Sequence, residues 1–252
     1  MTRTADDLRP FRLPVIFRVA VISVVFLFVV AACGGDKSGG PTGAPEDVVT
    51  RAPDVTLGAG TARIKINSPR ATAIGVVDLR NESGRLSVSA PGLPKPAVLL
   101  ISGGTGYVKQ VTDAGFVRLD AAVPEDLRGG DPFANIDLVR GTVHILSDGG
   151  NEVDGASTLR YTLTIDPQQA ISTTPPARQA ELRAVLENRT ALFPMDVWID
   201  STLHIRRVEV PTDLIPTTPA TRVDRLPIAS DVDYLAFGVP VGPTPAPAPA
   251  RA

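Results

Sequence analysis

Few residues of this 252-residue chain could do chemistry, and the sequence spaces them far apart. There is one cysteine, Cys33, and there are two histidines, His144 and His204. A single cysteine excludes an intramolecular disulfide framework and any multi-cysteine metal site, and two isolated histidines argue against a histidine-rich metal centre. Asp196 and Asp200 are candidate paired carboxylates, but the sequence has neither a calcium-loop spacing nor a GxSxG motif. We therefore predict no catalytic residues, no metal and no cofactor, and we do not expect an enzyme.

The cysteine lies at the junction of an apolar run and a glycine-rich polar run. Residues 1–18 are net basic, and residues 19–32 carry no charge. The sequence VAAC that ends at Cys33 resembles the bacterial lipobox, in which a diacylglyceryl group is attached to the cysteine sulfur before a peptidase cuts. We predict that residues 1–32 are a lipoprotein signal peptide. A single-pass anchor formed by the apolar run is the alternative.

Two low-complexity segments flank the part of the chain that we expect to fold. Residues 33–45 are rich in Gly, Ser and Pro, which is typical of a flexible tether. Residues 241–252 alternate Pro and Ala, which predicts a disordered, extended tail, with a contact to cell-wall polymer as the functional alternative. The folded domain is then predicted over residues 46–240.

The composition excludes some classes of partner. The 25 Lys and Arg residues nearly balance the 27 Asp and Glu residues, and no basic stripe is apparent. Aromatic residues make up only 5 % of the chain, which is low for a surface that stacks nucleic-acid bases. We expect no nucleic-acid partner.

Alternation of apolar and polar residues with period two recurs through residues 61–237 and predicts half-buried strands. Turn signals every 8–12 residues or so favour an antiparallel meander. The apolar residues on the predicted strand faces include Ile64, Ile66, Leu86, Val88, Leu159, Tyr161, Leu163, Val197 and Ile199. A filled core and an apolar pocket need the same residue types, so both readings stay open. Trp198 lies in phase with Asp196 and Asp200, and either lines a pocket or covers the sheet.

Three segments predict helices. Residues 45–60 suit a short or broken helix because Pro53 interrupts them. Residues 131–141 offer Asp131 as a cap, and residues 174–188 offer Thr174 as a cap. Few helices and many sequential strands indicate an α+β fold with a single large antiparallel sheet and its helices on one face. Such short helices would cover that face incompletely and leave a cavity.

The lipobox and three stretches carry a resemblance to a known family. The stretches are DPFANIDLVRG (131–141), VDGASTLRYTLTID (153–166) and PMDVWIDSTLHIRRVEV (194–210). Together they resemble the LppX/LprA/LprF/LprG family of actinobacterial lipoproteins, relatives of LolA- and LolB-type lipid carriers. The resemblance implies a curved sheet in the form of a half-barrel, LolA-like, with helices on its concave face. It also implies an apolar pocket for acyl chains, which the nine strand residues named above would line.

Two functions follow as expectations. The first is a membrane-anchored lipoprotein that binds or carries lipid or acylated glycolipid in the cell envelope. Its partners are the membrane, through Cys33 as an N-palmitoyl and S-diacylglycerol cysteine on the outer, extracytoplasmic face, and the lipid ligand. The alternative is a structural or interaction lipoprotein of the envelope with a packed core and no ligand. The proline-rich residues 211–230 have no assigned role in either.

Overall fold

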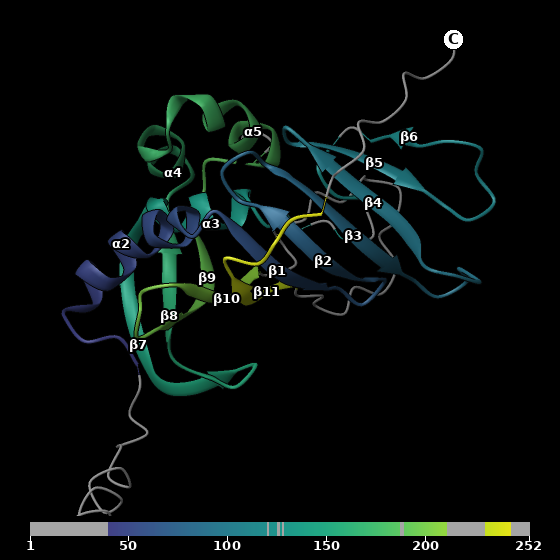
Figure 1. The fold of residues 1–252 in the computed structure, drawn as a ribbon. Coiled ribbons are helices and arrows are strands. Elements are labelled where there is room, and N and C mark those ends of the chain that lie inside the picture. Colours follow the sequence, from purple (N-terminus) through teal and green to yellow (C-terminus); the bar gives the residue numbers. More distant parts are fainter. Residues whose placement is uncertain are drawn as a thin grey trace, which may run out of the picture. The chain divides into compact units, whose positions relative to one another are not determined.

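Eleven strands form one antiparallel sheet in the computed structural model of the chain, and helices pack on one of its faces (Figure 1). The structure describes residues 40–119, 121–124, 127, 129–186, 189–210 and 230–242. The lipobox cysteine and most of the proline-rich segment fall outside these ranges. The prediction of an α+β fold with a single large sheet is confirmed.

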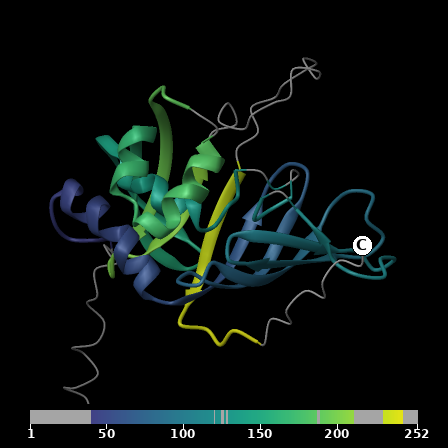
Figure 2. The ribbon, with the colours of Figure 1, turned by 90° about the horizontal axis from the view of Figure 1, so that it is seen from above.

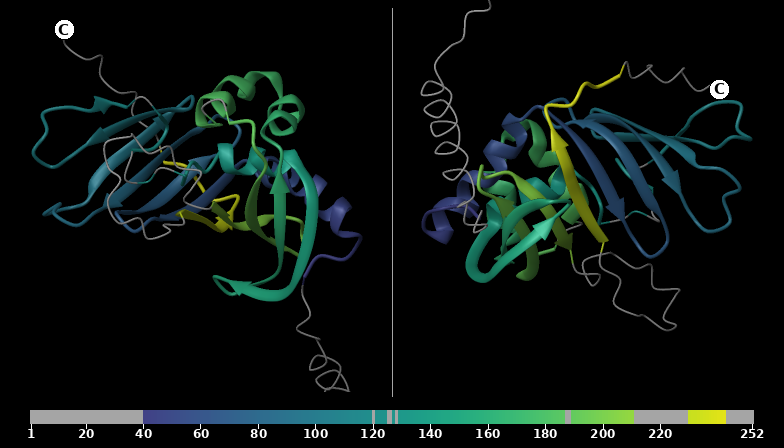
Figure 3. Two further views of the ribbon diagram at one scale, coloured as in Figure 1. Left: turned by 180° about the vertical axis from the view of Figure 1, so that it is seen from behind. Right: turned by 60° about the horizontal axis from the view of Figure 1, so that its bottom comes forward.

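The strands follow each other along the sheet almost in chain order. They are β1 (Thr61–Asn67), β2 (Thr72–Asp78), β3 (Ser83–Ser89), β4 (Ala97–Ser102), β5 (Thr105–Lys109), β6 (Val117–Arg118), β7 (Thr142–Val153), β8 (Ala156–Ile165), β9 (Phe193–Asp200), β10 (Ile205–Val210) and β11 (Ser230–Phe237). Their order in the sheet is β6-β5-β4-β3-β2-β1-β11-β10-β9-β8-β7. The last strand therefore lies in the centre, where it joins two meanders (Figure 3). In the described residues β6 and β7 are unpaired edges, so the sheet is open and not closed into a barrel.

The alternation of residue types determines which face of each strand is buried. In β1, Ala62, Ile64 and Ile66 are fully buried, and Arg63 between them is exposed. Burying one such isoleucine contributes about 1.5–3 kcal/mol, so a slip by one residue, which would exchange the faces, is strongly disfavoured. The same argument fixes the register of β3 through Leu86 and Val88.

The helices are α2 (Pro45–Gly58), α3 (Ala134–Leu138) with the short 3-10 helix η3 (Val139–Gly141), α4 (Pro167–Thr173) and α5 (Pro176–Leu186). The expectation of a short or broken first helix is wrong, because α2 is 14 residues long and continues through Pro53. Proline inside a helix costs about 3 kcal/mol. The burial of Val48, Val49 and Ala52 against the sheet offsets this cost.

Three local predictions differ from the structure. α4 was not predicted, although Asp166 caps it by accepting hydrogen bonds from the backbone N–H groups of Gln168 and Gln169. Asp followed by Pro is a known start signal for a helix. Thr174 is the C-cap of α4 rather than the N-cap of α5. Strand β7 extends to Val153 through glycines that favour a turn, because pairing with β8 continues on both sides of a bulge.

Candidate functional site

The structure brings the nine predicted strand residues together on the inner face of the sheet. Eight of them are buried at 5 % exposure or less and belong to one apolar cluster. Leu159 is partly buried and packs against the same cluster. Ile64 and Ile66 come from β1, Leu86 and Val88 from β3, Leu159, Tyr161 and Leu163 from β8, and Val197 and Ile199 from β9. Burial raises the pKa of Tyr161. Whether a ligand lies among these residues stays a prediction.

Helices cover the part of the inner face formed by β7 to β11 (Figures 1 and 2). Both α2 and α3 contact β10, and all five residues of α3 are buried. The Thr56 hydroxyl of α2 accepts a hydrogen bond from the backbone N–H of Ile205 at 2.9 Å, and it donates to the carbonyl of Ala52 at 2.8 Å. This fixes α2 at the start of β10.

Described residues between β6 and α3 pack against the sheet at β1 and β5. Ala122, Val123 and Leu127 are buried in the apolar cluster, although they belong to no strand or α-helix. The backbone N–H of Gly106 in β5 donates to the carbonyl of Ala121 at 3.0 Å. A Cβ atom at Gly130 would lie only 2.2 Å from Ile66 Cγ2. The chain backbone therefore lies directly on the sheet here, which the sequence did not predict.

An arginine of α5 connects the helices to the strand half that they do not cover. The Arg178 guanidinium lies 3.1 Å from Glu82 in the β2–β3 turn and 2.7 Å from Asp137 in α3. Its two terminal nitrogens donate to the carbonyls of Leu79 and Phe133 at 3.3 and 3.1 Å. Burial raises the pKa of Asp137, and the charge of Arg178 opposes that rise. Arg178 therefore links the turn, α3 and α5 at one buried point.

Glu181 lies one helical turn after Arg178 and borders the same cluster. Burial, then the negative charge of Asp131, then a hydrogen bond with the Glu82 carboxylate raise the pKa of Glu181 to about 9. A Cβ atom at Gly104, in the β4–β5 turn, would lie 2.9 Å from the Glu181 carboxyl. The Gly104 N–H donates to the Glu82 carbonyl at 3.2 Å. At neutral pH Glu181 is therefore a neutral acid packed against two turns of the sheet.

Asp131 and Tyr234 complete this buried border. The N-cap of α3 is Phe133 and not Asp131, so the predicted cap lies two residues too early. Asp131 instead holds the turn before α3 by accepting hydrogen bonds from the N–H groups of Phe133 and Ala134 at 2.9 and 3.0 Å. Burial raises the pKa of Asp131, and these two bonds oppose the rise. The Tyr234 hydroxyl donates to the carbonyl of Pro132, and burial raises the pKa of Tyr234 well above its ordinary value.

The outer face of the sheet carries a different arrangement, centred on Trp198. Its ring lies between the guanidinium groups of Arg160 and Arg207, at 5.3 and 5.6 Å. Arg160 is paired with Asp196 at 2.7 Å, and Arg207 with Asp233. Trp198 therefore covers the outer face, which is the second of the two roles left open for it. The charges of both arginines beside the ring are therefore paired locally.

Asp200 and His204 belong to the same hydrogen-bonded turn, whereas Asp196 pairs with Arg160. His204 stacks on Phe237 at 4.4 Å, and its Nδ1 lies 2.7 Å from the Thr202 hydroxyl. Asp200 accepts hydrogen bonds from Thr202 and pairs with Arg206 at 2.6 Å, which lowers its pKa against the opposing effect of burial. These contacts close the β9–β10 turn. No group of three or more metal-ligating side chains occurs among the described residues.

Sequence reasoning missed the cluster of Glu82, Asp137, Arg178 and Glu181. Glu82 and Arg178 lie nearly a hundred residues apart, and no spacing connects them. Cys33, the predicted lipidation site, lies outside the described residues. Within the described part of the chain, no helix has the length and apolar character needed to span a membrane.

Comparison with solved structures identifies the fold. Lipoprotein LppX of Mycobacterium tuberculosis aligns with a TM-score of 0.51 at 13 % identity, over 79 % of this chain and 99 % of that one. The chain has the LppX fold. LprF of Mycobacterium bovis aligns with a TM-score of 0.48 at 18 % identity, over 82 % of this chain and all of that one. The LolA superfamily protein NE2245 of Nitrosomonas europaea gives a TM-score of 0.32 at 10 % identity, over 80 % of this chain and 96 % of that one.

At these identities, the similarity to LppX concerns the fold and not the ligand. The resemblance predicted from the sequence is confirmed at the level of the fold, because the chain shares the fold of the mycobacterial lipoprotein LppX. No family model and no curated protein matches the sequence.

Proposed function

We propose that this chain is a membrane-anchored lipoprotein that binds or carries lipid or acylated glycolipid in the cell envelope. One observation carries the proposal. An open sheet with the LppX fold presents a continuous apolar cluster on its inner face, drawn from both halves of the sheet. Acyl chains are stabilised on such a face by about 0.8 kcal/mol for each buried CH₂ group.

The lipobox supplies the second part of the proposal. Acylated Cys33 would hold the mature chain, residues 33–252, on the outer face of the cell membrane. The tether of residues 33–45 would then connect the anchor to the domain, which begins with α2 at Pro45. LppX, whose fold this chain shares, is likewise a lipoprotein.

The work of such a protein is desolvation rather than chemistry. The described part of the chain offers buried apolar side chains and paired charges, and the buried carboxyl groups of Asp137 and Asp131 each have a structural partner. A carrier needs apolar contacts whose free energy binds the lipid, and it needs a means of releasing that lipid. This supports a binding protein rather than an enzyme.

The alternative is a structural lipoprotein of the envelope with no ligand. A specific observation favours it, because the inner-face side chains are already buried by the chain's own helices and by Ala122, Val123 and Leu127. In this reading the apolar cluster is a finished core. A carrier with the same contacts would have to separate part of this cover from the sheet in order to admit an acyl chain.

Native mass spectrometry and solvent extraction of the protein purified from its own host separate the two functions. We expect a co-purifying acyl lipid in stoichiometric amount. Its absence from protein that is fully folded would contradict carriage and leave the structural alternative. Cys33→Ala should release the protein from the membrane fraction, and retention in that fraction would overturn the anchor.

A further inference from the structure

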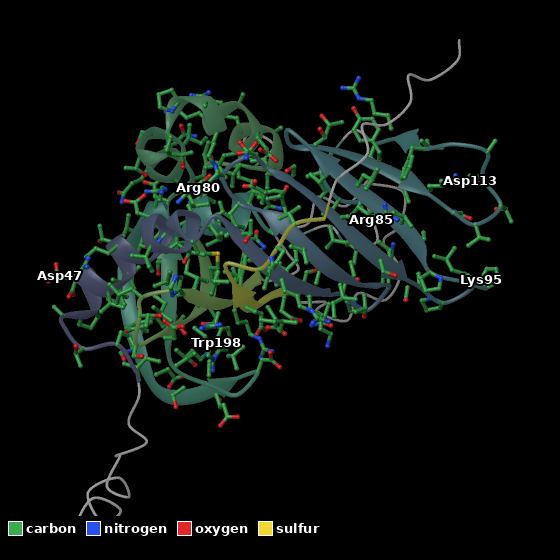
Figure 4. The ribbon with its side chains drawn as sticks, in the orientation of Figure 1. Asp47, Arg80, Arg85, Lys95, Asp113 and Trp198 are labelled. Atoms are coloured by element: carbon green, nitrogen blue, oxygen red, sulfur yellow. The ribbon has the colours of Figure 1, made fainter. Side chains whose placement is uncertain are left out.

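Three turns of the sheet lie together at one strand end. The register pairs Asn67 with Thr72, Val88 with Ala97, and Val98 with Lys109. The turns 68–71, 90–96 and 110–116 therefore project from the same end of β1 to β6. We call these turns, together with the flanking residues 109, 117 and 118, the rim. Figure 4 shows Lys95 and Asp113 on neighbouring turns at this end.

The rim exposes apolar side chains at its outer corner. Val111 is 61 % exposed and Val117, directly after the last turn, is 57 % exposed. Phe116 between them is partly exposed, and the ammonium of Lys109 lies 5.9 Å from the centre of its ring. Apolar side chains at a turn tip with a cation at their base suit a boundary between water and acyl chains.

The charge of the rim differs in sign from that of the chain. In residues 68–71, 90–96 and 109–118 there are four cations, Arg70, Lys95, Lys109 and Arg118, and one acid, Asp113, which leaves a surplus of three positive charges. The whole chain has a net charge of −2. Asp113 serves the turn itself, because its carboxylate accepts a hydrogen bond from the Gln110 N–H at 2.8 Å.

The rim is also separate from the place where the chain enters the domain. Gly40 lies against Leu159, since a Cβ atom there would be 2.5 Å from Leu159 Cγ. Leu159 pairs with Ile199 next to the β9–β10 turn. The rim lies at the other strand end, because Asn67 pairs with Asp231 at the start of β11. The first described residue of the domain and the rim therefore lie at opposite strand ends.

We propose that the rim docks on an anionic lipid surface, with Val111, Phe116 and Val117 at the depth of the first acyl carbons and the four cations among the headgroups. The surplus of positive charge favours anionic lipid headgroups over neutral ones. The exposed valines would contact acyl chains, which a membrane offers and an acidic protein surface does not. This goes beyond the proposed function, since it names a membrane contact that does not depend on a lipid held by the sheet. If the protein is a carrier, lipid would pass between the sheet and the membrane at the rim.

The test places a fluorophore on the rim of the full chain. Val117→Cys and, as a control, Leu146→Cys are labelled with NBD and reconstituted into vesicles. Leu146 is equally exposed, at 57 %, but lies on β7 at the opposite edge of the sheet. Vesicles contain either phosphatidylcholine alone or phosphatidylcholine with phosphatidylglycerol, and each carries a lipid with a spin label on its acyl chain. The intact mass of each labelled protein verifies that it carries a single NBD group. A second NBD group on Cys33 would show that this cysteine is not acylated, and the measurement would then use variants that also carry Cys33→Ser.

We expect the spin-labelled lipid to quench the fluorophore at position 117 about twofold or more in anionic vesicles, and much less in neutral ones. Lys95→Glu combined with Lys109→Glu should remove the difference between the vesicles. Equal quenching at positions 117 and 146, or no quenching at 117, would overturn the proposal. Binding of the rim to an added acidic protein but not to the vesicles would overturn it too. The extraction experiment above is separate, so loss of rim docking and absence of a carried lipid are distinguishable.

Discussion

At the scale of single residues, the half-buried acid Glu181 makes stability depend on pH. Its pKa in the folded chain is raised to about 9 from an ordinary value of 4.5. The folded chain therefore holds this proton more tightly than the unfolded chain does. The free energy of unfolding falls as the pH rises from about 4.5 to about 9, because the unfolded chain releases the proton first.

Glu181→Gln should remove this part of the pH dependence. Glutamine keeps the shape of the protonated acid and has no proton to lose, so at neutral pH its stability should stay within about 1 kcal/mol of wild type. Urea unfolding over a series of pH values measures the slope. Asp131 and Asp137 should leave a residual slope of the same sign, since burial raises the pKa of each. Parallel curves for the two proteins would show that Glu181 is ionised in the folded chain.

Gly130 tests whether the segment between β6 and α3 lies directly on the sheet. Gly130→Ala would place a Cβ atom 2.2 Å from Ile66 Cγ2, so either the backbone at residue 130 or the Ile66 side chain must move. We expect a loss of about 1–3 kcal/mol in the free energy of unfolding. Gly115→Ala is the matched control, because nothing lies within 4 Å of its Cβ position. An equal effect of the two substitutions would contradict the close contact at Gly130.

At the scale of elements, the strands could be predicted from the sequence and the helices only in part. Alternation in β1, β3 and β8 follows from burial of one face, which is a local property of the sequence. The length of α2 depended instead on packing, which outweighs the cost of Pro53. The extension of β7 depended on the neighbouring strand β8, because pairing across the bulge overrides the preference of its glycines for a turn.

The contact of α2 with β10 rests on Thr56, which is fully buried. Thr56→Val keeps the volume of the side chain but removes the acceptor for the Ile205 N–H group. An unsatisfied buried donor costs about 1–3 kcal/mol, and we expect a loss of that size in thermal or urea unfolding. Thr56→Ser is the control, since it retains the hydroxyl and gives up only a methyl group. If serine proves as damaging as valine, packing rather than the hydrogen bond holds α2 in place.

At the scale of the whole molecule, the cover of the inner face was beyond the reach of the sequence. The nine strand residues were predicted because their periodicity is regular, and the structure collects them in one cluster. The cover depends on contacts between distant parts of the chain, such as Arg178 with Glu82 and Gly130 with Ile66. No local pattern encodes such pairs, so the sequence left open whether this face is a core or a pocket.

A substitution on the inner face can separate a finished core from a face that holds acyl chains. Leu86 lies in β3, in the half of the sheet that the helices do not cover, and is 1 % exposed. In a finished core, Leu86→Ala costs about 2–5 kcal/mol, because it leaves a cavity that the surroundings fill only in part. In a carrier, a flexible acyl chain can occupy that space, so the loss should be smaller in protein purified with its lipid than in delipidated protein. Urea unfolding of both preparations measures the difference. Equal losses in the two would mean that the bound lipid does not reach this strand, and a packed core would then account for the burial of Leu86.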